Sequence, residues 1–135
     1  MTARIGLGLV VAAFVVWAAV AVAAEARDQD RAYALNREGM VAMSEARFED
    51  AIAAFDHAAE LAADYAIMGR PLMYTPVFMS GWGSEKIGRT KHACRAYREY
   101  LRIAVEHPVE PTKVDHANAY VAANCGDRNS VDSVK

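Results

Sequence analysis

The chain has 135 residues, and its 15 lysines and arginines against 17 aspartates and glutamates leave a formal net charge of −2. Charges of both signs are spread without long blocks, so the sequence lacks the basic surface by which a protein attracts nucleic acid. Once an N-terminal export segment is set aside, the remaining length suits one small domain.

The first 24 residues are typical of an export signal. An unbroken apolar run from Ile5 to Ala24 follows the single positive charge of Arg4 and precedes a charged stretch. Small residues close this run, as signal peptidase prefers. We therefore expect a signal peptide over residues 1–24, cleaved after Ala23 or Ala24.

The alternative is an uncleaved anchor in the inner membrane, because about 20 apolar residues are enough for a helix to cross a bilayer. In both interpretations the positive end stays in the cytoplasm and the rest of the chain is exported. We therefore expect a periplasmic protein, either free or anchored in the inner membrane with its domain facing the periplasm.

Two amphipathic helices are predicted after the export segment. Apolar and small residues recur three or four positions apart from Leu35 to Met43, which predicts a helix over residues 30–44. After a short break, the same spacing continues from Phe48 to Ala62 and predicts a second helix.

Proline and glycine residues mark the limits of three further helices. Thr75 with Pro76 is typical of an N-cap followed by proline at the first helical position, and this third helix should stop near Gly88. A fourth helix should end before Pro108, and a fifth should begin at Pro111. The sequence thus predicts five helices and no strand.

These helices are expected to form one domain over residues 30–126, with Gly126 as the C-terminal cap of the fifth helix. Residues 127–135 are polar and lack periodicity. Such a segment buries too little apolar surface to offset the entropy of ordering, so we expect a disordered tail.

An offset of 42 residues aligns two copies of one pattern in the chain. The pattern is a glycine, an alanine twelve residues later and an aromatic residue four further on: Gly39, Ala51 and Phe55, then Gly81, Ala93 and Tyr97. It resembles the tetratricopeptide repeat family, in which small residues lie where two antiparallel helices approach closely. The first copy, residues 32–65, also has the family's 34-residue length.

The second copy, residues 74–107, departs from the family pattern. Thr90 and Tyr100 stand where Phe48 and Ala58 stand in the first copy, and residues 66–73 are inserted between the copies. The resemblance implies an all-α fold: a short array of two antiparallel helix pairs and a C-terminal capping helix, behind an N-terminal signal or anchor helix.

No catalytic or metal-binding constellation is predicted. His92 and Cys94 are two residues apart on a helix and so do not face each other, whereas metal ligands on one helix are normally three or four apart. The sequence has no phosphate-binding loop, no nucleophile motif and no paired carboxylates in an apolar setting. We therefore expect no catalytic residue, metal or cofactor.

A protein-binding groove is implied by the resemblance. In that family the first helix of each repeat lines a concave face that contacts peptide or protein ligands. The matching positions, called here the first-helix stripe, are Tyr33, Asn36, Met40 and Met43, then Thr75, Phe78, Trp82 and Glu85. Methionine and aromatic side chains suit adaptable recognition. The alternative is that Met40, Phe78 and Trp82 pack against the final helix or against one another.

The two cysteines of the chain are expected to pair, because exported thiols tend to oxidise. The midpoint between Cys94 and Cys125 falls in the turn between the fourth and fifth helices. In an antiparallel hairpin they lie at the same height and on apolar faces, which predicts a disulfide. The alternative is two buried free thiols.

These features predict a non-catalytic protein–protein interaction module or assembly factor of the bacterial cell envelope, whose partner is another protein or a peptide. The alternative is a membrane-anchored accessory subunit of an envelope complex, in which the N-terminal helix persists.

Overall fold

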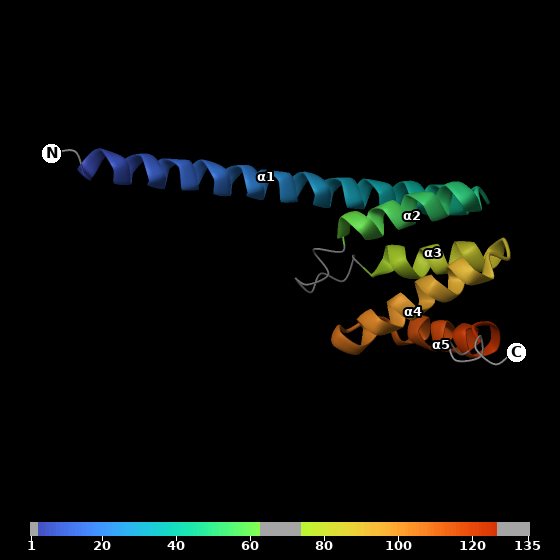
Figure 1. Cartoon of the computed structure of the whole chain (residues 1–135). Helices are drawn as coiled ribbons and strands as arrows, with labels where there is room; N and C mark the ends of the chain where they lie inside the picture. The colour runs from blue at the N-terminus through green and yellow to red at the C-terminus, as the bar shows by residue number, and fades with distance from the viewer. Residues whose placement is uncertain (1–2, 63–73, 127–135) are drawn as a thin grey trace, which may run out of the picture.

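The computed structural model describes residues 3–62 and 74–126, with side chains from residue 13 onward except that of Glu25. Within these residues the protein is all-α and contains five helices (Figure 1). This confirms the all-α class that the sequence predicts.

Three of the sequence expectations fall wholly or partly outside the described residues. They are the insertion at 66–73, the disordered tail at 127–135, and the beginning of the signal peptide, whose side chains are described only from residue 13.

The helices are α1 Ala3–Ser44, α2 Phe48–Ala62, α3 Thr75–Lys86, α4 Thr90–Glu106 and α5 Pro111–Asn124. The second to fifth follow the limits predicted from proline, glycine and apolar spacing. One detail differs, because Tyr74 occupies the N-cap position of α3 and Thr75 is already helical.

The first helix, α1, is much longer than expected. It continues without a break from the apolar segment into the first helix of the domain, where the sequence analysis placed a helix start near Asp30. The physical reason is that no proline occurs before Pro71 and no glycine lies between Gly8 and Gly39. Nothing in this stretch therefore interrupts the helical hydrogen bonds.

The N-terminal half of α1 extends away from the other helices (Figure 1). Phe14 and Trp17 are 70% and 69% exposed, and Ala32 is the first buried residue of the described chain. The packed domain therefore begins at Ala32. Among the described residues, no helix is both long enough and apolar enough to span a membrane.

The helices stack in chain order, each against the one before it. α1 and α2 form one pair, α3 and α4 form a second, and α5 lies against α4 at the end of the stack (Figure 1). Gly83 lies where the pairs meet, since a Cβ there would be 3.1 Å from Ile52 Cγ1 and 3.3 Å from Met43 Cε. A small residue at this position lets α3 approach both helices of the first pair.

Each pair is closed around a contact between a glycine and an aromatic ring. A Cβ on Gly39 would lie 2.7 Å from Cε1 of Phe55, and one on Gly81 would lie 2.8 Å from Cε1 of Tyr97. Phe55 and Tyr97 are both 0% exposed. Because non-bonded carbon atoms normally stay about 3.5 to 4 Å apart, only glycine allows these rings to lie against the first helix of their pair.

The turn inside each pair has the same hydrogen bonding. A backbone N–H donates to the carbonyl five residues back at 2.8 Å, from Arg47 in the first turn and from Arg89 in the second. This bond is typical of a helix end that contains one left-handed residue. That residue is Ala46, with φ 57°, in the first turn and Gly88, with φ 71°, in the second. The two turns are 42 residues apart, the offset found in the sequence.

The end of α5 is joined to α4 by a disulfide and by hydrogen bonds. The expected Cys94–Cys125 disulfide is present, with Cα atoms 5.7 Å apart. Arg98 of α4 donates from Nη2 to the carbonyls of Cys125 and Gly126 at 3.1 and 3.0 Å. The expected glycine cap is wrong, because Gly126 does not have a positive φ. A side chain of α4 satisfies these carbonyls instead.

A methyl group on either close-packed glycine should destabilise its helix pair. Gly39→Ala and Gly81→Ala each force a buried ring to move, and overpacking of this kind lowers the free energy of unfolding by about 1 to 3 kcal/mol. Gly126→Ala is the matched control, since nothing lies within 4 Å of its Cβ. Urea denaturation measures the three variants, and equal stability of all three would contradict the close approach.

The two turns should respond in opposite directions to exchanging alanine and glycine. Ala46→Gly should raise the free energy of unfolding by up to about 1 kcal/mol, because glycine adopts a positive φ without steric cost. Gly88→Ala should lower it by about 1 kcal/mol. A Cβ at Gly88 meets nothing within 4 Å, so the backbone alone causes the loss. Thermal melts that shift in the same direction for both variants would contradict the shared turn geometry.

Removing the disulfide should weaken the domain substantially. The bond closes a loop across 31 residues of sequence, and the chain-entropy treatment assigns such a loop about 3.5 kcal/mol of stabilisation. The double variant Cys94→Ala and Cys125→Ala should lose about this amount in urea denaturation. Thiol labelling of the denatured, unreduced wild-type protein provides the check, and two labelled thiols per chain would refute the bridge.

Candidate functional site

One residue of the first-helix stripe, Phe78, lies in the core. It is 7% exposed, and its ring centroid is 5.5 Å from that of Tyr97 and 5.2 Å from that of Tyr100. The ring of His116 on α5 lies 5.9 Å away. For Phe78 the structure therefore agrees with the alternative that it packs against the final helix.

Glu85 of the stripe is also held by internal contacts. The Tyr97 hydroxyl donates to Glu85 Oε2 at 2.7 Å, and His116 Nε2 lies 2.9 Å from the same oxygen. Burial raises the pKa of the Tyr97 phenol, and its hydrogen bond to the carboxylate raises that pKa further. These three side chains link α3, α4 and α5, so Glu85 stabilises the end of the stack.

The space beside Tyr33 and Asn36 is too small for a ligand side chain. These residues line a cavity of about 10 Å³ together with Pro76 of α3. The buried Oδ1 of Asn36 has no hydrogen-bond partner among the described atoms. A cavity of this size holds about one water molecule.

The remaining members of the stripe differ in exposure. Met40 is the most open of the eight, at 45% exposed, whereas Met43 and Thr75 are half-buried. Trp82 is half-buried as well, and the Lys86 ammonium lies 5.4 Å from the centroid of its ring. The structure thus places the stripe along α1 and α3, but much of it is occupied by contacts within the domain.

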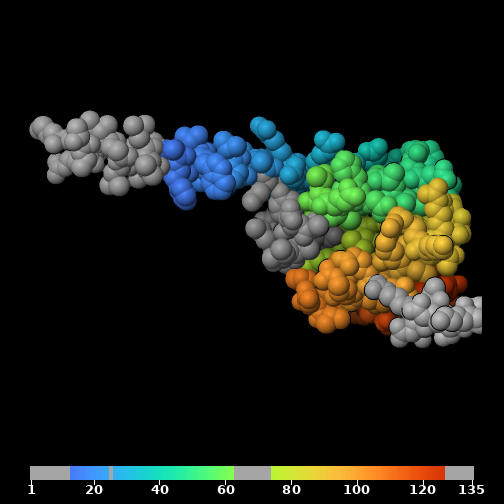
Figure 2. Space-filling view, viewed as in Figure 1, coloured from blue at the N-terminus to red at the C-terminus, as the bar shows by residue number. Residues whose placement is uncertain are grey.

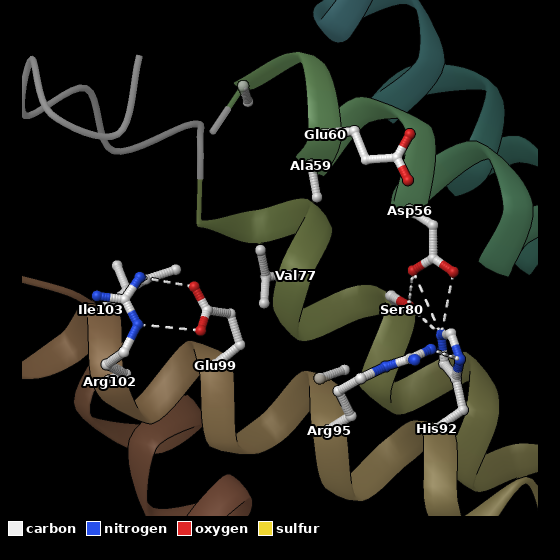
Figure 3. Close-up of a pocket in the computed structure, with 12 residues that line it drawn as sticks. Asp56, Ala59, Glu60, Val77, Ser80, His92, Arg95, Glu99, Arg102 and Ile103 are labelled. Atoms are coloured by element: carbon white, nitrogen blue, oxygen red, sulfur yellow. Dashed lines mark hydrogen bonds and ion pairs between the residues drawn. The ribbon is translucent and has the colours of Figure 1, made fainter. Parts of the chain in front are cut away.

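A groove of about 480 Å³ lies between α2 and α4, with α3 beneath it (Figure 3). In the space-filling view, α3 is recessed between these two helices (Figure 2). Small and aliphatic side chains form the floor of this second-helix groove: Ala59, Ala62, Val77, Ala96 and Ile103. Polar and charged side chains complete its lining: Asp56 and Glu60 from α2, Ser80 from α3, and His92, Arg95, Glu99 and Arg102 from α4.

Asp56, Ser80 and His92 meet at one end of the groove (Figure 3). The Ser80 hydroxyl donates to Asp56 Oδ1 and lies 3.1 Å from His92 Nε2. His92 Nε2 is also 3.1 Å from Asp56 Oδ2. One residue from each of three helices therefore contributes to this polar cluster.

The proton positions in this cluster differ from those of a nucleophilic triad. Arg95 Nη2 lies 2.8 Å from His92 Nδ1, and a guanidinium can only donate, so Nδ1 is the acceptor and Nε2 carries the proton. His92 therefore presents a donor, not a base, to Ser80, and the serine hydrogen is directed at Asp56. In a triad the carboxylate and the serine contact opposite nitrogens of the ring.

An ion pair on α4 lines the other end of the groove (Figure 3). Arg102 donates to both carboxylate oxygens of Glu99, at 2.7 and 3.0 Å. The hydrogen bonding from Arg102 lowers the pKa of the Glu99 carboxyl. This pair lies on the exposed side of α4, and the Arg102 side chain is 61% exposed.

The residues of the polar cluster are far apart in the sequence, and their spacing did not predict that they meet. Ser80 is 24 residues from Asp56, and His92 is 36 residues from Asp56. One signal was present, because Ser80 is a polar residue directly before Gly81, which packs against Tyr97. A polar side chain beside such a close contact requires a partner.

The described residues contain no grouping of three or more histidine, cysteine, aspartate and glutamate side chains placed to hold a metal ion. Comparisons with protein families, curated proteins and solved structures find no match to this chain. No relative therefore supplies a function for the groove or for the stripe.

The exposure of the stripe residues predicts how they affect stability. Phe78→Ala should lower the free energy of unfolding by about 3 to 5 kcal/mol, because it leaves a cavity in the aromatic cluster. Met40→Ala should change it by about 0.5 kcal/mol, since an exposed side chain loses little packing. The half-buried Trp82→Ala should fall between the two. Chemical denaturation checks this order, and a Phe78 variant as stable as the Met40 variant would contradict the packing.

Proposed function

We propose that the chain is a non-catalytic protein-binding module of the bacterial cell envelope, built as a short tetratricopeptide-like array. α1 with α2 and α3 with α4 are the two repeats in this proposal, and α5 is the capping helix. Support comes from the 42-residue offset, which relates the glycine–aromatic contacts and the turns of the two pairs. The single observation that carries the binding function is the second-helix groove, an open space of about 480 Å³ with an apolar floor and a charged rim.

The polar cluster in this groove favours binding over catalysis. With Nε2 protonated, His92 does not activate Ser80, and Asp56 accepts the serine hydrogen instead of orienting the ring from its far side. Ser80 is 1% exposed, which also limits its access to a substrate carbonyl. These contacts instead hold α2, α3 and α4 at fixed positions around the groove.

Export is the second part of the proposal, and the disulfide supports it. The Cys94–Cys125 bond is stable in an oxidising compartment such as the periplasm. Cleavage after Ala23 or Ala24 would remove none of the buried residues that the structure describes, because the first of these is Ala32. The mature domain therefore keeps its described core after cleavage.

Site-specific photocrosslinking in the native envelope tests the proposed function. A photoreactive residue would replace Ala59 in the groove, Met40 on the stripe, or the exposed Ala119 on α5 as the matched control. We expect a discrete adduct with another protein from Ala59 or Met40, and none from Ala119. Equal adducts from all three positions, or none from any, would contradict a defined binding surface.

Mass spectrometry of the same protein determines its N-terminus. A start at Ala24 or Glu25 is expected for the exported, cleaved form. An intact N-terminus together with stable membrane association would favour the accessory subunit anchored by α1.

A further inference from the structure

We propose that the second-helix groove and the adjoining face of α4 bind an acidic protein segment that carries an aliphatic side chain. This inference rests on the proposed protein-binding function and specifies the chemistry of the partner. Three features of the domain support it: the charge of α4, the apolar floor of the groove, and the acidic wall on α2.

The outward face of α4 carries four cations in one line. Lys91, Arg95, Arg98 and Arg102 follow one another at spacings of four, three and four residues, which places them on one side of a helix. They line a depression of about 490 Å³ together with Glu99. Four cations and one carboxylate leave an excess of three positive charges there, although the chain as a whole has a net charge of −2.

Most of this charge is not neutralised by the described residues of the domain. Arg98 donates to backbone carbonyls, and Arg95 contacts the neutral ring of His92, so both keep their full charge. Among the carboxylates that the structure describes, that of Glu99 pairs with Arg102, and none pairs with the other three cations. Lys91, Arg95 and Arg102 are exposed and Arg98 is half-buried, and a line of such cations favours a partner with several carboxylates.

The apolar floor distinguishes a protein segment from other anions. Arg95, Glu99 and Arg102 line both the depression on α4 and the second-helix groove, so the two spaces are continuous. The floor beneath this rim includes Val77 of α3 and Ile103, which is 6% exposed. A flat lipid surface would contact the rim alone, whereas a protein segment can insert an aliphatic side chain between α2 and α4.

The acidic side chains of α2 determine the orientation of the bound segment. Glu60 is exposed on that wall, and Asp56 is joined there to Ser80 and His92 (Figure 3). Carboxylates of a partner are repelled from this side and attracted to α4. The acidic residues of the segment therefore lie along α4, and its aliphatic side chain occupies the floor.

A binding measurement with defined peptides tests this proposal. The probe is a short capped peptide in which two leucines stand among aspartates, and two matched peptides replace the aspartates by lysines or the leucines by serines. Chemical-shift mapping with the disulfide-intact protein should show binding of the first peptide alone, with shifts confined to α2, α3 and α4. Binding should weaken as salt is raised, because the contacts are exposed and charged.

Two kinds of variant measure separately how the charge of α4 and the apolar floor contribute to peptide binding. The double variant Lys91→Glu and Arg95→Glu should weaken peptide binding by about tenfold or more, and Ala96→Leu should weaken it by filling the floor. Arg37→Glu, a change of charge at an exposed position on α1, is the matched control and should leave binding unchanged. Thermal melts of each variant confirm that the domain remains folded.

Several outcomes would overturn the inference. They are equal binding of the lysine peptide, shifts that map to the first-helix stripe, and binding of phosphatidylglycerol vesicles or single-stranded DNA without binding of the aspartate peptide. Crosslinked adducts from Met40 together with a lack of peptide binding in the groove would leave the proposed function standing and reject this inference. A lack of adducts from both surfaces would instead reject the proposed function.

Discussion

The structure depends on the close approach of two helices at a glycine. In each pair a fully buried ring, Phe55 or Tyr97, occupies the space that a Cβ of Gly39 or Gly81 would need. A side chain there would separate the helices and expose the ring, and dispersion contacts in the core would be lost along the whole pair. The angle and spacing of each pair therefore follow from one residue without a side chain.

The second pair is stabilised by additional hydrogen bonds and ring contacts. Its ring belongs to a tyrosine, whose hydroxyl requires a partner when buried, and Glu85 and His116 provide it. The rings of Phe78 and Tyr100 pack with those of Tyr97 and His116, and together they form an aromatic cluster beneath α5. Two helix pairs bury limited apolar surface, so the disulfide and the cluster stabilise the end of the stack, where no further helix follows in the described chain.

These stabilising contacts also determine which surface is open. The aromatic cluster and α5 occupy the stripe at Phe78 and Glu85 on α3, whereas the space between α2 and α4 is left open. The two second helices differ in charge, because α2 presents Asp56 and Glu60 and α4 presents Arg95 and Arg102. The proposed binding of an acidic segment uses this difference, since opposite walls of one groove then select both the charge and the placement of the partner.

The sequence by itself determined the elements that arise from local periodicity: α2 to α5, the two glycine–aromatic pairs and the Cys94–Cys125 bond. These depend on spacing within one helix or across one turn, which the order of residues specifies directly. Tertiary structure alone decided two other features: the burial of Phe78, and the meeting of Asp56, Ser80 and His92. Both join residues on different helices, so they depend on how the pairs stack. The insertion at 66–73 makes the offset between the two copies 42 residues instead of the 34 of a tetratricopeptide repeat, so the repeat pattern does not specify how the pairs stack.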